Sequence, residues 1–201
     1  MKIDLYKLAK MNEIAKEGAR RVAENLSAML GMDVEMKITK IDFVTLSDIP
    51  EEIGDSEMVG VYLMFFGTPS GHLMVLFPVT SAKKVANLLL AGIGENGGNG
   101  ENCDEFSELD LSAIGEIGNI ITSSFIDGWA NVLKTEIDIS TPQVIHDMGS
   151  AVIDPIIVEL SKEHDHAFVF NSSITAKDKD ITCQIYVFPD MDKLVEALEK
   201  L

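Results

Sequence analysis

The chain has 201 residues, of which 46% are hydrophobic and 24% charged, with 33 acidic side chains against 16 basic ones. This length suits one domain or two small halves around a buried core, and the composition is typical of a folded globular chain. The net charge of −17 would repel phosphate groups. It therefore argues against nucleic acid and anionic membrane surfaces as the main partners.

The apolar runs of the chain are short. The longest, such as 59–66 and 73–79, fall well below the ~20 residues that a membrane span needs, so we expect no membrane insertion. The first residues interrupt their apolar positions with charges, unlike a secretory signal. We therefore expect a cytoplasmic protein in which Cys103 and Cys183 are reduced thiols.

The first half of the chain reads as a helix, three strands and a second helix. Apolar residues recur at steps of three and four over 4–30, which predicts a long amphipathic helix. Alternation predicts a strand at 34–44, and two apolar runs at 58–66 and 72–77 predict a hairpin. A helix at 81–91 closes this half.

A segment rich in glycine and asparagine, 93–102, follows and is predicted as a linker. It does not end in the lysine that a phosphate-binding loop requires. Beyond it the order of elements in the first half returns. The expected elements are a helix at 109–133, a strand at 136–145, a short helix at 151–161, strands at 167–175 and 181–188, and a helix at 192–201.

The repeated order predicts a duplicated unit, with one repeat over 1–92 and the other over 103–201. A three-stranded sheet is too small to be stable alone, so we expect the halves to share a core. The predicted fold class is α/β (α+β), with a single domain over 1–201. Its pseudo-two-fold repeats of helix-strand-strand-strand-helix form one six-stranded, mainly antiparallel sheet with two long helices on one face.

The long helix of the second half carries polar residues at helical spacing. With about 100° per residue, Ser112, Glu116, Asn119 and Ser123 fall on one face of a helical wheel. The opposite face is apolar. A polar side is normal for any amphipathic helix, so this stripe alone is equally typical of a solvated surface.

Two glycines, Gly115 and Gly118, flank this polar stripe. Each costs about 1 kcal/mol relative to alanine inside a helix. We expect that another backbone approaches the helix closely there, because only a glycine would leave the space.

The spacing Asp/Ser-x3-Glu-x2-Asn, filled by Ser112, Glu116 and Asn119 and followed 23 residues later by Pro142, resembles the signature of the CheC/CheX/FliY family of chemotaxis phosphatases. Segment 147–160 is also similar to CheC, and two halves with a central linker favour the CheC type. The resemblance implies hydrolysis of the phosphoaspartate of the phosphorylated response regulator CheY, in two-component signalling.

The resemblance also implies roles for these residues. Glu116 would contact the active-site lysine of CheY, and Asn119 would orient the attacking water. Ser112 would line the same face, and Pro142 would shape the strand beside it. An acyl phosphate needs little covalent help, and an amide can both donate and accept a hydrogen bond, so positioning a water is sufficient. The protein would need no metal or other cofactor of its own, since CheY would supply Mg²⁺.

Proteins of this type can carry a second site in the first half. Aligning the two long helices places Glu13 against Glu116 and Lys16 against Asn119. We expect Glu13 and Lys16, one turn apart, to form an ion pair. A lysine cannot accept the hydrogen bond that would hold a water, so this first site is predicted to be degenerate and catalytically silent.

The apolar segment 151–160 has two open interpretations. The resemblance makes Val152, Ile153, Asp154 and Ile157 candidates for binding the receptor deamidase CheD. Surplus apolar surface is equally typical of a core helix between strands.

Two further interpretations concern function and partners. The alternative to a phosphatase is a weakly catalytic or non-catalytic adaptor that sequesters CheD or acts at the flagellar switch. Histidines at 146, 164 and 166 lie near acidic residues, but the spacing of known metal sites is missing, so no metal site is predicted. The expected state is a monomer or a heterodimer with CheD.

Overall fold

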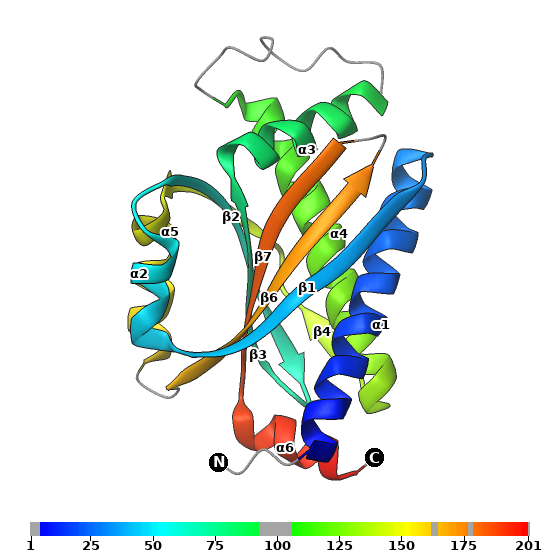
Figure 1. Ribbon diagram of the computed structural model, residues 1–201, viewed down its shortest axis with the longest axis vertical. Helices are drawn as coiled ribbons and strands as arrows, with labels where there is room; N and C mark the ends of the chain where they lie inside the picture. Colours follow the sequence, from blue (N-terminus) through cyan, green and yellow to red (C-terminus); the bar gives the residue numbers. More distant parts are fainter. Residues whose placement is uncertain (1–4, 93–105, 162–164, 177–178, 201) are drawn as a thin grey trace.

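The structure is a computed structural model that describes residues 5–92, 106–161, 165–176 and 179–200. These segments form one mainly antiparallel sheet with helices packed on it, as expected, and six α-helices where the sequence predicted five (Figure 1). The predicted linker 93–102 lies outside the described residues. The elements are α1 (Leu5–Leu30), β1 (Val34–Thr45), the 3₁₀ helix η1 (Leu46–Asp48), α2 (Ile49–Ile53), β2 (Glu57–Gly67), β3 (Gly71–Pro78), α3 (Val79–Gly92), α4 (Glu108–Leu133), β4 (Ile137–Ile139), β5 (Gln143–Met148), α5 (Gly149–Leu160), β6 (His166–Ala176), β7 (Lys179–Pro189) and α6 (Met191–Glu199).

The sheet runs in the order β1-β6-β7-β3-β2-β4, with β5 also paired to β2, and all pairings are antiparallel. The described residues thus form seven strands rather than six, because the predicted strand at 136–145 is divided into β4 and β5. Between them, the Ser140 hydroxyl accepts a hydrogen bond from the Met64 amide at 3.0 Å. Pro142 has no amide hydrogen to donate, which favours a break in the ladder there.

Exchanging the two halves of the chain reverses the strand order and leaves it otherwise unchanged. β1 pairs with β6 of the other half. In the same way, β4 and β5 both pair with β2 of the other half. α1 and α4 each contain 26 residues. This arrangement is the one that a duplicated unit would produce, and the duplication itself stays a prediction.

Helices cover both faces of the sheet. α1 and α4 lie side by side on one face, as predicted, with α3 at one end and α6 at the other (Figure 1). The larger core fills this layer, and Trp129 of α4 is fully buried there among the rings of Phe65, Phe125 and Phe170.

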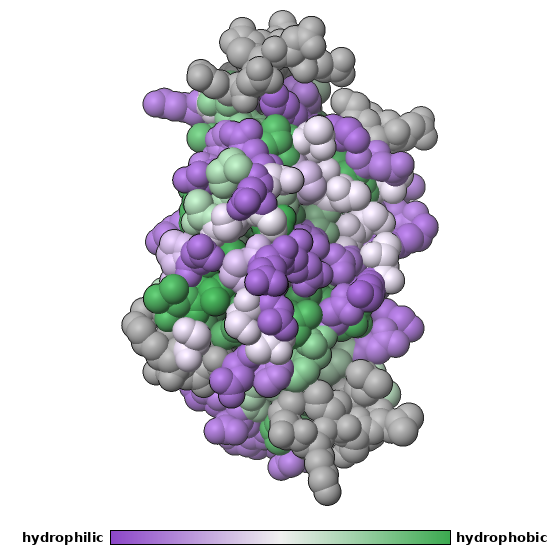
Figure 2. All heavy atoms as spheres, turned by 60° about the vertical axis from the view of Figure 1, so that its left-hand side comes forward, coloured by the Kyte–Doolittle hydropathy of each residue, from purple (hydrophilic) through white to green (hydrophobic). Residues whose placement is uncertain are grey.

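α2 and α5 enclose a smaller core on the other face of the sheet. α2 is absent from the sequence-based prediction, because its five residues are too few to show a helical period. Figure 2 shows hydrophilic side chains over most of this side, with hydrophobic residues gathered in small areas between them. In the described part of the chain, every helix is too short or too polar to cross a membrane.

Candidate functional site on helix α4

The start and end of α4 are both well defined. At its N-terminus, the Ser107 hydroxyl accepts from the Asp110 amide at 3.1 Å, and the Asp110 carboxylate accepts from the Ser107 amide at 2.9 Å. This reciprocal pair is a capping box, which satisfies amides that a helix start otherwise leaves unpaired. At the other end, Lys134 turns into the left-handed conformation and its amide bonds to the Ala130 carbonyl. α4 is therefore unbroken through all the candidate residues on it.

The predicted polar stripe of α4 faces solvent. Ser112 and Glu116 are exposed, whereas Asn119 and Ser123 are half-buried. In the described residues, neither the Glu116 carboxylate nor the side-chain amide of Asn119 makes a hydrogen bond or an ion pair within the chain. The opposite face is buried through Ile114, Ile117, Ile121 and Phe125. The structure thus brings together a carboxylate and an amide, less than one turn apart, with their polar groups available to a partner.

Gly115 and Gly118 let α4 lie close to the sheet. A Cβ atom added at Gly118 would lie 2.5 Å from Cγ2 of Val61 on β2, and one at Gly115 would lie 2.9 Å from Cγ2 of Val144 on β5. The predicted close approach is confirmed, but the expectation that a backbone approaches there is wrong. Branched side chains fill the space, because strands present their side chains perpendicular to the sheet.

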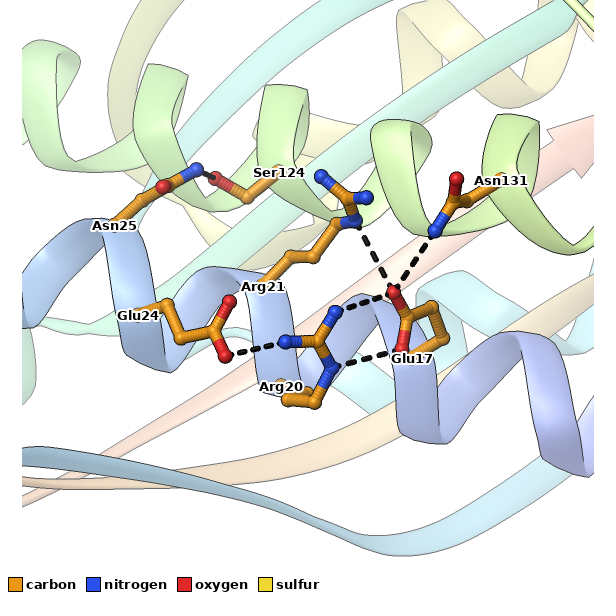
Figure 3. Close-up of polar contacts among 7 residues, drawn as sticks. All are labelled: Glu17, Arg20, Arg21, Glu24, Asn25, Ser124 and Asn131. Carbon is orange, nitrogen blue, oxygen red and sulfur yellow. Dashed lines mark hydrogen bonds and ion pairs between the residues drawn. The ribbon is translucent and has the colours of Figure 1, made fainter.

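The backbone approach occurs further along, where α1 crosses α4. A Cβ atom at Gly128 would lie 2.5 Å from both the nitrogen and the Cα of Gly18. One hydrogen bond also joins the helices here, from the Asn25 side-chain amide to the Ser124 hydroxyl at 2.8 Å (Figure 3). α4 thus packs against α1 along one side and against β2 and β5 on the side that faces the sheet.

A charged cluster on α1 adds a second link to α4 (Figure 3). The Glu17 carboxylate accepts hydrogen bonds from Arg20 at 2.6 and 2.8 Å, from Arg21 at 3.2 Å and from Asn131 of α4 at 3.2 Å. Hydrogen bonds from Arg20, followed by those from Asn131 and Arg21, lower the pKa of Glu17 from 4.5 to about 2. The sequence analysis missed this cluster. The i,i+3 and i,i+4 spacing of Glu17, Arg20 and Arg21 could have indicated the pairs within α1, but no local pattern points to the contact with Asn131.

Pro142 lies at the junction between β4 and β5 and is half-buried. Two residues later, the side chain of Val144 packs where Gly115 lacks one. The edge strand that Pro142 interrupts therefore contacts α4 directly before Glu116. Of the four predicted residues, Ser112, Glu116 and Asn119 share one helix face, and Pro142 belongs to the neighbouring strand.

The first half places its candidate residues differently from the prediction. Glu13 and Lys16 are both exposed on α1. The Glu13 carboxylate lies 3.0 Å from the Lys10 ammonium, so the expected ion pair with Lys16 is wrong. Position i−3 competes on equal terms with i+3 on a helix surface, and the spacing alone did not separate them.

The candidate CheD-binding residues on α5 are mostly inside the protein. Val152 and Ile153 are fully buried, Ile157 is 7% exposed, and all three pack in the smaller core. Asp154 is exposed. For the three apolar side chains, burial supports the interpretation as a core helix.

The two described histidines of the group considered as metal ligands, His146 and His166, have an acidic and an aromatic neighbour respectively. His166 stacks on Phe43 with ring centroids 4.9 Å apart, and Nε2 of His146 lies 3.1 Å from a Glu57 carboxylate oxygen. Within the described ranges, no three or more His, Cys, Asp or Glu side chains form a group that could hold a metal ion. Residues 163 and 164 lie outside those ranges.

Burial raises the pKa of the Cys183 thiol to about 12, so this thiol is a poor nucleophile.

Comparison with known proteins agrees with this architecture. The CheC-like family matches residues 109–146, which include all but the first residue of α4, all of β4 and most of β5. CheC1 of Halobacterium salinarum is 40% identical over 99% of this chain and 98% of its own length. The CheY-P phosphatase CheC of Bacillus subtilis is 25% identical over 95% of this chain and 90% of its own length.

Among solved structures, FliY of Thermotoga maritima superimposes with a TM-score of 0.77 at 18% identity, covering 100% of this chain and 99% of that one. The fold is therefore that of the FliY and CheC proteins. With the full-length relative at 40% identity, the chain belongs to the CheC-like family, and the resemblance in its motif is confirmed.

Proposed function

We propose that this protein is a phosphatase that hydrolyses the phosphoaspartate of phosphorylated CheY at the exposed face of α4. Its relative in Bacillus subtilis is named for this activity. The observation that carries the proposal is that Glu116 and Asn119 lie on one solvent-facing stripe of an unbroken helix. Their polar groups have no partner in the described part of the chain, so they are free to contact another protein.

Hydrolysis of an acyl phosphate depends mainly on the position of the attacking water. The water oxygen bonds to phosphorus while the bond from phosphorus to the aspartate oxygen breaks. The carboxylate stays on CheY, inorganic phosphate leaves, and the proton lost by the water passes to phosphate or solvent. The side-chain amide of Asn119 accepts one hydrogen bond from the water and donates another to the phosphoryl group. These two bonds fix the direction of attack, and the amide does so without changing its own protonation state.

Glu116 serves recognition in this proposal. Its carboxylate meets the ammonium of a lysine beside the phosphoaspartate, which sets the register between the proteins. Ser112, one turn earlier on the same exposed face, lines this contact. We assign Mg²⁺ to CheY, where it neutralises charge on the phosphoryl oxygens, and no metal to this chain.

The proposed activity has one site. In the first half, Lys16 occupies the position equivalent to Asn119, and Glu13 is paired with Lys10. An ammonium only donates hydrogen bonds, so it cannot hold a water as the amide does. We therefore assign no hydrolysis to α1.

Binding of CheY tests the proposed role of Glu116. Glu116→Lys places a cation against the CheY lysine, and we expect association to weaken at least about tenfold, because like charges at an interface repel. The matched control is Asp127→Lys, which makes the same charge change on an exposed residue of α4 about 16 Å further along the axis. Titration calorimetry with CheY carrying a beryllofluoride phosphoryl mimic gives both affinities. Equal weakening by the two variants, or none by Glu116→Lys, would contradict the contact.

We also propose CheD as a partner, in a heterodimer with an otherwise monomeric chain. The support is the likeness of segment 147–160 to CheC and the exposure of Asp154 and of Val158, which is 64% exposed. Because Val152, Ile153 and Ile157 are buried, such a contact uses the outer side of α5. A chain that binds CheD but does not speed CheY dephosphorylation would be an adaptor instead.

A further inference from the structure

Two hydroxyl groups of α4 converge on the backbone of Asn119. The Ser123 hydroxyl donates to the Asn119 carbonyl at 2.7 Å. The Thr122 hydroxyl donates to the same carbonyl at 3.0 Å and to the Gly118 carbonyl at 2.9 Å. Thr122 is fully buried, whereas Ser123 is half-buried on the polar stripe. A helix carbonyl ordinarily accepts from the amide four residues later, so these bonds are additional to those that form the helix.

The residues that supply and surround these bonds are poor helix formers. Gly115 and Gly118 lie on either side of Glu116, and only proline disfavours a helix interior more than glycine does. Serine and threonine also rank below alanine and leucine, and a hydroxyl that bonds to the preceding turn tends to bend a helix. The glycines make room for Val61 and Val144. The two hydroxyls therefore need a different explanation, since neither the stability of α4 nor its close packing requires them.

The first half of the chain shows that such a helix can lie on the sheet without these hydroxyls. α1 is as long as α4 and packs on the same face. The positions 103 residues before Thr122 and Ser123 are Ala19 and Arg20. Alanine has no hydroxyl, and the Arg20 guanidinium bonds to carboxylates of α1. The half that has a lysine in place of Asn119 thus also lacks both hydroxyls, so they accompany the amide and not the fold.

The direction of the Asn119 side chain depends on its backbone. Across the part of the chain that the structure describes, its side-chain amide has no hydrogen-bond partner that could fix its orientation. The carbonyl that accepts the two hydroxyl bonds belongs to the peptide plane directly after the Cα atom of Asn119. A functional group must be held within about 0.5 Å of its productive position by supporting contacts, and a shift near 1 Å can lower a rate by about 100-fold.

We propose that Ser123 and Thr122 are positioning residues for the side-chain amide of Asn119. Their hydroxyls hold the Asn119 carbonyl, which fixes the adjoining peptide plane and keeps the amide directed towards the phosphoaspartate of CheY. In this role they act through Asn119 and not on the reacting atoms. The inference rests on the proposed phosphatase function and adds two residues to its site.

Variants of matched shape test the role of the Ser123 hydroxyl. Ser123→Thr keeps a hydroxyl that can bond to the carbonyl four residues earlier, whereas Ser123→Val has nearly the same shape without it. Single-turnover hydrolysis of phosphorylated CheY at increasing concentrations of each variant gives the maximal rate and the half-saturating concentration. We expect Ser123→Val to lower the maximal rate about tenfold and to leave the half-saturating concentration within about twofold, because the contact with CheY is intact. Ser123→Thr should stay within about twofold of the wild type in both.

The same comparison at position 122 uses Thr122→Val and Thr122→Ser. We expect Thr122→Val to lower the maximal rate at least about threefold and Thr122→Ser to keep it, since only the serine retains the hydroxyl. Ser161→Ala is the control, because it removes a hydroxyl bond of 3.2 Å to the Val158 carbonyl at the end of α5, on the other face of the sheet. It should keep the wild-type rate. Circular dichroism melts check the fold of each variant.

A double variant separates positioning from a general effect on the helix. Asn119→Ala has no amide to position, so adding Ser123→Val should change its rate by less than about twofold. A merely structural hydroxyl would lower the rate equally with and without Asn119.

The outcomes distinguish this inference from the proposed function. A Ser123→Val protein as fast as the wild type, an equal loss in Ser123→Thr, or the same tenfold loss in the Asn119→Ala background would overturn the positioning role and leave the phosphatase function standing. If the wild type does not speed hydrolysis of phosphorylated CheY, or if Asn119→Ala is as fast as the wild type, the proposed mechanism itself is contradicted, and the positioning role with it.

Discussion

Replacing Gly118 by alanine tests how α4 is held beside the site. The added Cβ would lie 2.5 Å from Cγ2 of Val61 and 2.8 Å from its Cβ and Cγ1, whereas ordinary contacts begin at 3.4 Å. Val61 is fully buried and branched at Cβ, so its side chain cannot swing away. Either α4 or β2 must move by about 0.9 Å, and Asn119 is the next residue on that helix.

Two opposing contributions set the change in the free energy of unfolding of Gly118→Ala. Alanine gains about 1 kcal/mol over glycine in a helix interior, while overpacking a dense core costs about 1–3 kcal/mol. We therefore expect a net loss of about 1 kcal/mol in the free energy of unfolding. A shift near 1 Å at the site can lower a rate by about 100-fold, so we expect the rate of CheY-P hydrolysis to fall at least about tenfold.

Gly115→Ala is the matched control. Its Cβ would meet one atom, Cγ2 of Val144, at 2.9 Å. Val144 is half-buried on an edge strand, so it can yield by a few tenths of an ångström. Urea unfolding and initial phosphatase rates are measured for both variants. Helix propensity alone predicts that Gly118→Ala is about 1 kcal/mol more stable than the wild type. A variant with that stability and full activity would refute the close packing of α4 on Val61.

Two further predictions concern charge. Glu17 has a pKa lowered from 4.5 to about 2, so its stabilising contribution is fully present above about pH 4.5 and is lost as the pH falls towards 2. We expect Glu17→Gln to lose about 1 kcal/mol at pH 7, since the cluster is partly exposed, and its difference from wild type to vanish near pH 2 in urea titrations. A pH-independent difference would refute this. For α5, we expect Asp154→Lys to weaken CheD binding in calorimetry at least about fivefold with Glu51→Lys on α2 as control, and unchanged binding would remove α5 from that interface.

The sequence predicted the long elements well. The bounds of α1 and α4 differ from the prediction by one residue at most, because seven turns of regular apolar spacing leave little freedom. The hairpin β2–β3 was equally clear, since its apolar runs flank a turn with glycine and proline. Glu116 and Asn119 share the expected face because helix geometry alone fixes their relative direction.

Features that depend on contacts between distant segments could not be predicted. The break between β4 and β5 is favoured by Pro142, but its position also depends on pairing with β2, where the Met64 amide donates to the Ser140 hydroxyl. The link from Glu17 to Asn131 joins residues 114 positions apart. Likewise, the burial of Val152 is set by the sheet face beneath α5 and not by the apolar pattern of that helix, which fits a core or an interface equally.

The most direct test of the proposed mechanism is single-turnover hydrolysis of phosphorylated CheY by Asn119→Ala. We expect the rate to fall about 100-fold, as for loss of a group that acts on the reacting atoms, while binding to CheY and the free energy of unfolding change little. Asn87→Ala, an exposed asparagine on α3, serves as the matched control and should keep the wild-type rate. An Asn119→Ala protein that hydrolyses phosphorylated CheY as fast as the wild type would contradict the assignment of the water-orienting amide to α4.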